Sequence, residues 1–286
     1  MATIRNPIEW GAEQLRHATS HVESSGRSIR GQGEPAARPA VRRIGLGDLR
    51  EALAKGFDDF MAYRTDVLFL CIVYPLAGLI LARFAFHYDL LPLLFPLASG
   101  FALIGPVAAV GLYEMSRRRE QGAEVSWGDA FGMIGSPSFG AIVALGLLLL
   151  AIFLAWLAAA YLIYYFTLGP EPPASLSGFV RDVFATGAGW AMIVIGVSVG
   201  FLFALLVLAI SVVSFPLLLD RDVGVGTAIA TSMRAVRENP APMAAWGLLV
   251  AAGLVIGSIP LLLGLIVVMP VLGHATWHLY RKVVAP

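Results

Sequence analysis

Two histidines near the end of the chain have the types and spacing that most directly suggest chemistry. His274 and His278 are four residues apart in an apolar segment, so in a helix they share one face, about 6 Å apart. Two imidazoles so placed can begin a metal or haem site, which usually needs three or four protein ligands, and Glu114 is the candidate third ligand. The same residue types also form the ordinary belt at the end of a membrane span. We favour the belt, and predict no metal site and no cofactor.

A second motif, G-x-S-x-G, occurs as Gly196-Val-Ser198-Val-Gly200. In soluble hydrolases this motif needs a strand, a strained turn and a helix, which an apolar run does not provide. An intramembrane serine protease would need His274 as the base of Ser198. However, Ser198 lies about 33 Å of helix from the charged residue after its run, whereas His274 lies about 10 Å from its own. A serine and its base must approach to about 3 Å, so we predict no enzyme activity.

The glycines of that motif are better explained by packing between helices. Glycines four residues apart let two membrane helices approach closely, in the pattern called small-xxx-small. The pattern occurs twice, and we predict a packing role for Gly196, Gly200, Gly253 and Gly257.

The composition decides which elements must position these residues. Of the 286 residues, 58% are hydrophobic and only 14% are charged, against about 25% charged in a typical soluble domain. A single cysteine excludes a disulfide scaffold, and a net charge of +1 argues against a nucleic-acid partner. The sequence therefore predicts an all-α membrane protein.

Six apolar runs are long enough to cross about 30 Å of hydrocarbon, which takes about 20 helical residues. The last two are contiguous from residue 243 to 280, and one helix of that length would measure about 57 Å, so we place a break near Gly257–Pro260. The predicted spans are 67–86, 90–113, 139–168, 187–213, 241–258 and 261–280.

The positions of the basic residues agree with six spans. With this topology 18 of the 20 lysines and arginines fall on one side, and only Arg83 and Arg181 fall on the other. Cytoplasmic connections carry an excess of Lys and Arg. We therefore expect both termini in the cytoplasm.

An internal repeat relates the ends of the second and sixth spans. PVAAVGLYEMSRR from Pro106 and PVLGHATWHLYRK from Pro270 share Pro-Val, an aromatic residue seven positions later and a basic pair at positions eleven and twelve. Apolar residues at helical spacing also precede each hairpin of spans, which fits short helices lying in the membrane interface. We predict three repeats of an interfacial helix and a hairpin, with these stripes: Leu46, Leu49, Leu53 and Phe57; Trp127, Phe131 and Ile134; Ile229, Met233 and Val236.

The region before the spans differs in character. Residues 1–42 contain six arginines in a Ser-, Gly- and Pro-rich context with no long apolar run, which predicts a disordered cytoplasmic tail. The membrane domain then covers residues 43–284.

From Arg43 to Val284 the chain resembles a bacterial family of integral membrane proteins, domain of unknown function 2189. The resemblance lies in RRIGLGDLREALAKGFDDF, in SFPLLLDRDVGVGTAIATSMRAVRENPAPMAAWGLLV and in PVLGHATWHLYRKVV. The chain is more loosely similar to six-span families in which a cytoplasmic helix carries Ala, Ser and Asn, here Ala230, Ser232 and Asn239. The resemblance implies a bacterial inner-membrane location and supplies no catalytic residue.

These observations favour a non-enzymatic accessory or scaffold protein of the inner membrane. Its partners would be the lipid bilayer and other membrane proteins, and the sequence does not determine its oligomeric state. A channel or carrier for a neutral or lipidic solute is the first alternative, because prolines interrupt several spans. Ion coupling is disfavoured because no ionisable residue lies at the centre of a span. An accessory metal or haem role for His274 and His278 is the second alternative.

Overall fold

The computed structural model describes residues 39–71, 88–123, 125, 130, 136–260 and 262–285. Helices account for the regular structure of these residues, apart from one isolated β-bridge. In chain order the elements are α2 (Leu46–Cys71), the 3₁₀ helix η1 (Tyr88–Leu93), α4 (Leu94–Ala108), α5 (Val110–Glu120), α6 (Phe139–Thr167), α7 (Leu176–Ala185), α8 (Gly187–Ser211), α9 (Ser214–Asp220), α10 (Val225–Glu238), α11 (Pro240–Ser258) and α12 (Leu265–Val283).

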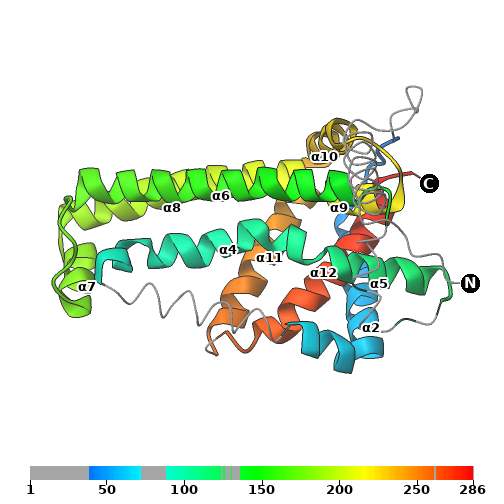
Figure 1. The fold of residues 1–286 in the computed structure, drawn as a ribbon, viewed down its shortest axis with the longest axis horizontal. Helices are drawn as coiled ribbons and strands as arrows, with labels where there is room; N and C mark the ends of the chain where they lie inside the picture. Colours follow the sequence, from blue (N-terminus) through cyan, green and yellow to red (C-terminus); the bar gives the residue numbers. More distant parts are fainter. Residues whose placement is uncertain are drawn as a thin grey trace, which may run out of the picture.

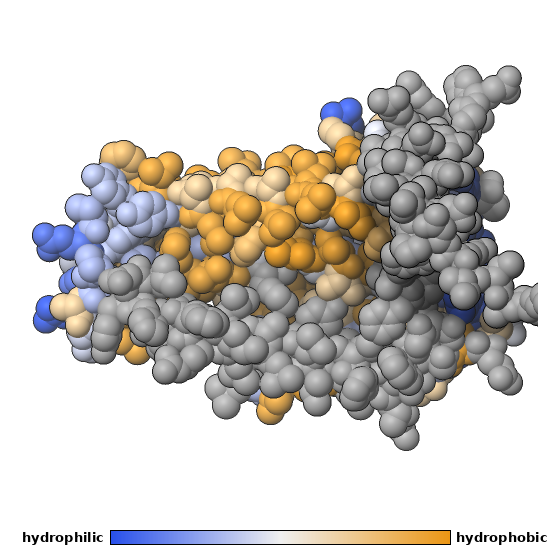
Figure 2. Space-filling model, in the orientation of Figure 1, coloured by the Kyte–Doolittle hydropathy of each residue, from blue (hydrophilic) through white to orange (hydrophobic). Residues whose placement is uncertain are grey.

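Long apolar helices form the body of the molecule. α6 and α8 lie side by side and α4 packs against α6, while α7 lies at one end and α2, α9, α10 and α12 gather toward the other (Figure 1). Large apolar side chains such as Leu147, Leu154 and Phe201 are exposed, and Figure 2 shows a broad hydrophobic band over this region, with hydrophilic residues at the α7 end. A continuous apolar surface of this kind fits contact with lipid.

Four stretches of helix among the described residues are long and apolar enough to cross a membrane. They are Leu91–Glu120, Phe139–Thr167, Gly187–Asp220 and Pro240–Ser258, and they correspond to the second to fifth predicted spans. α11 ends at Ser258 and α12 begins at Leu265, so the predicted break between the last two runs is present. α12 occupies most of the predicted sixth span, 261–280, but is not among the four. Most of the predicted first span, 67–86, lies outside the described residues, and six spans and a threefold repeat are therefore not confirmed.

Helices are present at two of the three segments predicted to lie in the membrane interface. α10 is a separate helix, and α2 has a kink at Tyr63 (φ −120°, ψ 22°), between the predicted interfacial segment and the predicted span. The stripe 127–134 lies outside the described residues except for Ala130.

The buried face of α2 overlaps the predicted stripe only in part. Leu49 is buried and Leu53 packs against the core, but Leu46 and Phe57 are exposed. The rest of the buried face is made by Ala52, Gly56 and Phe60. Small residues make up part of this face since α12 approaches α2 very closely.

α7 is a helix that the sequence patterns did not predict. The Ser175 side chain accepts a hydrogen bond from the Gly178 amide (3.0 Å), and Thr186 does the same for Gly189 at the start of α8 (3.0 Å). These are ordinary N-terminal caps, which satisfy amides that have no partner within the helix.

Three of the four glycines with a predicted packing role lie at close contacts. A Cβ atom on Gly200 would lie 3.0 Å from Trp156, one on Gly253 3.2 Å from Val268, and one on Gly257 2.8 Å from Leu265. Gly196 differs, since a Cβ atom there would have no neighbour within 4 Å. Of the two glycines of the G-x-S-x-G motif, Gly200 therefore packs against a neighbouring helix and Gly196 does not.

The two ends of the described chain are joined. Val41 and Val284 form an antiparallel bridge, in which the Arg42 amide donates to the Val283 carbonyl (2.7 Å) and the Ala285 amide to the Ala40 carbonyl (2.9 Å). Residues 39–42, which the composition assigned to the tail, are thus held against the C-terminus. If the chain crosses the membrane between these points, it crosses it an even number of times.

Candidate functional site

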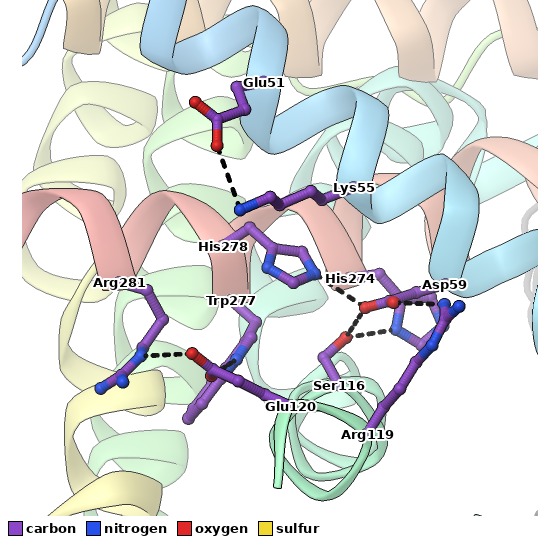
Figure 3. A network of polar contacts seen from close by, with 10 residues as sticks. All are labelled: Glu51, Lys55, Asp59, Ser116, Arg119, Glu120, His274, Trp277, His278 and Arg281. Atoms are coloured by element: carbon purple, nitrogen blue, oxygen red, sulfur yellow. Dashed lines mark hydrogen bonds and ion pairs between the residues drawn. The ribbon is translucent and has the colours of Figure 1, made fainter. Parts of the chain in front are cut away.

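A buried carboxylate joins three helices at the end of the molecule where Val41 meets Val284. Asp59 of α2 accepts hydrogen bonds from the Ser116 hydroxyl (2.6 Å), His278 Nε2 (2.8 Å) and Arg119 Nη1 (2.6 Å). Ser116 in turn lies 2.8 Å from His274 Nδ1 (Figure 3). We call these five residues the Asp59 network.

The surrounding helices account for the position of each member. Asp59 follows Gly56 by three residues, so both lie on the face of α2 that contacts α12. A Cβ atom on Gly56 would lie 2.5 Å from the Ala275 backbone nitrogen, so only glycine permits this approach. His274 and His278 lie one turn apart on α12, while Ser116 and Arg119 lie on one face of α5.

Hydrogen-bond accounting assigns the protons in the network. A serine hydroxyl has one proton, and Ser116 donates it to Asp59. His274 must then donate its Nδ1 proton to the Ser116 oxygen, which leaves Nε2 as a bare acceptor; this tautomer is assigned from the bonding pattern. His274 is 0% exposed, and its Nε2 atom has no hydrogen-bond partner in the described part of the chain.

Opposing effects set the ionisation of Asp59. Burial raises the pKa of this carboxyl, but hydrogen bonds from His278 and Ser116 outweigh burial and hold the pKa below its usual value. Asp59 is therefore ionised at neutral pH, where its charge is balanced by Arg119.

This shift predicts a specific dependence of stability on pH. A carboxyl whose pKa is lower in the folded state stabilises the fold above its unfolded pKa, near 4, and that contribution is lost as the pH falls through the folded value. We expect the difference in unfolding free energy between the wild type and Asp59→Asn to shrink as the pH falls below about 4. Thermal unfolding in detergent at several pH values measures it. A difference that does not change with pH would contradict the assignment.

Further bonds fasten the C-terminal end of α12. Glu120 of α5 accepts from Trp277 Nε1 (3.0 Å) and Arg281 Nε (3.1 Å), and Asp220 at the end of α9 accepts from the Tyr280 hydroxyl (2.6 Å). The Asp59 network is therefore one part of a larger set of contacts that fixes α12 against α2, α5 and α9.

The candidate metal ligands do not come together. Glu114 is buried and pairs with Arg117 (2.8 Å) and Arg118 (2.7 Å) of its own helix, and no described bond joins it to His274 or His278. The described residues contain no group of three His, Cys, Asp or Glu side chains arranged to hold a metal ion. Instead, His274 bonds to Ser116 and His278 bonds to Asp59.

The two members of the candidate serine protease pair each bond to a different group. The Ser198 hydroxyl donates to the Val194 carbonyl within α8 (2.7 Å), whereas His274 bonds to Ser116. Nor is Ser116 arranged as a nucleophile, because in a catalytic triad the serine donates to the histidine and the carboxylate orients that histidine. Here the serine lies between carboxylate and imidazole and donates to the carboxylate. This arrangement joins helices and does not activate the hydroxyl.

Sequence reasoning missed Asp59 and Ser116. A usable signal for Asp59 was its place on the same helical face as Ala52 and Gly56, where a carboxylate interrupts a stripe of small and apolar residues. Ser116 carried no comparable signal.

The Asn of the Ala-Ser-Asn pattern has a clear structural role. The Asn239 side chain accepts from the Ile44 amide (2.7 Å) and donates to the Arg42 carbonyl (3.0 Å), which fixes the segment leading into α2. Ser232 accepts from the Val213 amide (3.3 Å), whereas Ala230 is exposed.

A family model matches part of the chain. The model of the family described as predicted integral membrane protein, DUF2189, matches residues 94–220, from α4 to the end of α9. This range is shorter than residues 43–284, over which the sequence resemblance extends. Neither curated proteins nor solved structures match the chain. The chain is an integral membrane protein that matches the family domain of unknown function 2189 over residues 94–220, and the resemblance is confirmed over that range.

Proposed function

We propose that this protein is a non-enzymatic accessory or scaffold protein of the bacterial inner membrane, which acts through contacts with other membrane proteins. The observation that carries the proposal is the division of α2 into two faces. The inner face holds Asp59, whose bonds among the described residues run to α5 and α12, while the outer face leaves Leu46, Phe57 and Met61 exposed at 64%, 48% and 45%. The polar groups hold the fold together, and the apolar outer face is available for contact.

The charge distribution supports a cytoplasmic position for this end of the molecule. The basic residues of α5, α10 and α12 lie at the end where Val41 meets Val284, whereas Arg181 lies on α7 at the opposite end (Figure 1). An excess of Lys and Arg is typical of cytoplasmic connections, which supports a cytoplasmic position for this end of the molecule.

The outer face of α2 is a better target for a test than α10. Ile229 and Met233 pack against the hydrophobic core, so a charged substitution there would disturb the fold itself. Phe57 and Met61 are outside the buried core, so a substitution there should affect the contact with a partner without disturbing the fold.

The experiment places a photo-crosslinking residue at position 57 or 61 in native membranes, with position 201 or 202 on the exposed face of α8 as the matched control. We expect position 57 or 61 to give a discrete protein adduct that the α8 positions do not give. Phe57→Asp with Met61→Asp should abolish co-purification of that partner and leave thermal stability in detergent unchanged. Crosslinking to lipid alone from both helices would overturn the proposal.

A further inference from the structure

The bonds of Asn239 bring together basic residues that lie almost 200 positions apart. Because Asn239 binds the backbone of Arg42 and Ile44, residues 42–44 lie beside the C-terminal end of α10. Arg234 of α10 also donates to the Pro39 carbonyl. We call Arg42, Arg43, Arg234 and Arg237 the arginine patch.

Most of the charge of the arginine patch is free to act outward. The only acidic partner of the patch in the described residues is Glu238, whose carboxylate lies 3.5 Å from Arg234 Nε. Arg42, Arg43 and Arg237 are exposed, and their guanidinium groups bond to no described residue. Four positive charges therefore face one negative charge.

The arginine patch lies directly before a candidate membrane span. α11, one of the four candidate spans, begins at Pro240, three residues after Arg237 and directly after Asn239. A residue one turn before the first apolar turn of a span lies at the level of the lipid headgroups. Asn239 fixes Arg42 and Arg43 at that same level.

We propose that the arginine patch binds the headgroups of anionic phospholipids. The planar guanidinium group matches the phosphate oxygens with two parallel hydrogen bonds, and basic residues next to a span are attracted to an anionic membrane surface. The proposal is independent of the partner contact through α2, since it uses different residues and a different ligand.

The test measures the affinity of phosphatidylglycerol for the purified full chain in phosphatidylcholine nanodiscs. Three variants are compared with the wild type: the triple change Arg42→Gln, Arg43→Gln and Arg237→Gln; the triple change of the same residues to Lys; and Arg181→Gln at the opposite end. Each basic residue near an anionic surface raises the binding affinity roughly fivefold, so we expect the Gln triple to bind phosphatidylglycerol about 100-fold more weakly. The Lys triple should retain most of the affinity, and Arg181→Gln should behave as the wild type.

Stability in phosphatidylcholine alone serves as the folding control, and it should not change in the Gln triple because its side chains are exposed. Equal phosphatidylglycerol affinity in the Gln triple and in Arg181→Gln would overturn the proposal. The proposal would also be overturned if the Gln triple kept its affinity for phosphatidylglycerol and lost only a crosslink to an acidic protein.

Discussion

Asp59→Ala is expected to lower the free energy of unfolding by about 3 kcal/mol, since removing one partner of a buried charged network costs about 3–5 kcal/mol. Ser116 is 1% exposed and would lose the acceptor of its proton, and His278 would lose its acceptor as well. Arg119 has 37% of its side chain exposed and can turn to water, which places the expected cost at the lower end of that range.

The neighbouring carboxylate provides the matched control. Asp58 has the same side chain, is exposed on a different face of α2 and makes no described bond, so Asp58→Ala should change stability by less than about 0.5 kcal/mol. Denaturation in detergent, followed by the fluorescence of buried residues such as Trp246 and Trp277, measures both variants. Similar losses in the two variants would show that Asp59 does not join the helices.

The second large effect is expected at the closest approach of α2 and α12. Gly56→Ala would place a Cβ atom 2.5 Å from the backbone nitrogen and 2.6 Å from the Cβ atom of Ala275. Backbone atoms cannot rotate out of the way, so the two helices must separate, and overpacking of this kind costs about 1–3 kcal/mol. We expect a loss near 3 kcal/mol, because separation also lengthens the bond between Asp59 and His278.

Gly47 on the same helix is the control for this substitution. A Cβ atom there would have no neighbour within 4 Å, so Gly47→Ala should be neutral or should stabilise the helix by up to about 1 kcal/mol. The free energies of Gly56→Ala and Asp59→Ala should not add in the double variant, since both act on one interface. A stabilising effect of Gly56→Ala would contradict the observed packing.

Several elements of the fold could be predicted from the sequence because their causes are local. The lengths of α6, α8 and α11 follow from uninterrupted apolar runs, and the break between α11 and α12 follows from glycine and proline near 257–260. α10 follows from apolar residues at helical spacing. In each case transfer of a segment into lipid and backbone preference act on neighbouring residues, so the pattern is readable within one short window.

Other features could not be read in this way. The exposed positions of Leu46 and Phe57 depend on which face of α2 is covered by α12. An amphipathic stripe in the sequence does not predict which helix packs against it. Gly196 and Gly200 are four residues apart and share one face of α8, yet only Gly200 packs against a large side chain, that of Trp156. Spacing predicts which residues share a face, and the neighbouring helix decides what that face meets.

The sequence by itself determined that this chain is an integral membrane protein built of apolar helices, and which residues carry its few charges. Only the tertiary structure decided how those charges pair: Asp59 binds Ser116, His278 and Arg119 across separations of 57, 219 and 60 residues. The physical reason is that burial in lipid depends on the composition of one segment. A hydrogen bond of 2.6 to 2.8 Å instead depends on the relative placement of several helices, which no single segment specifies.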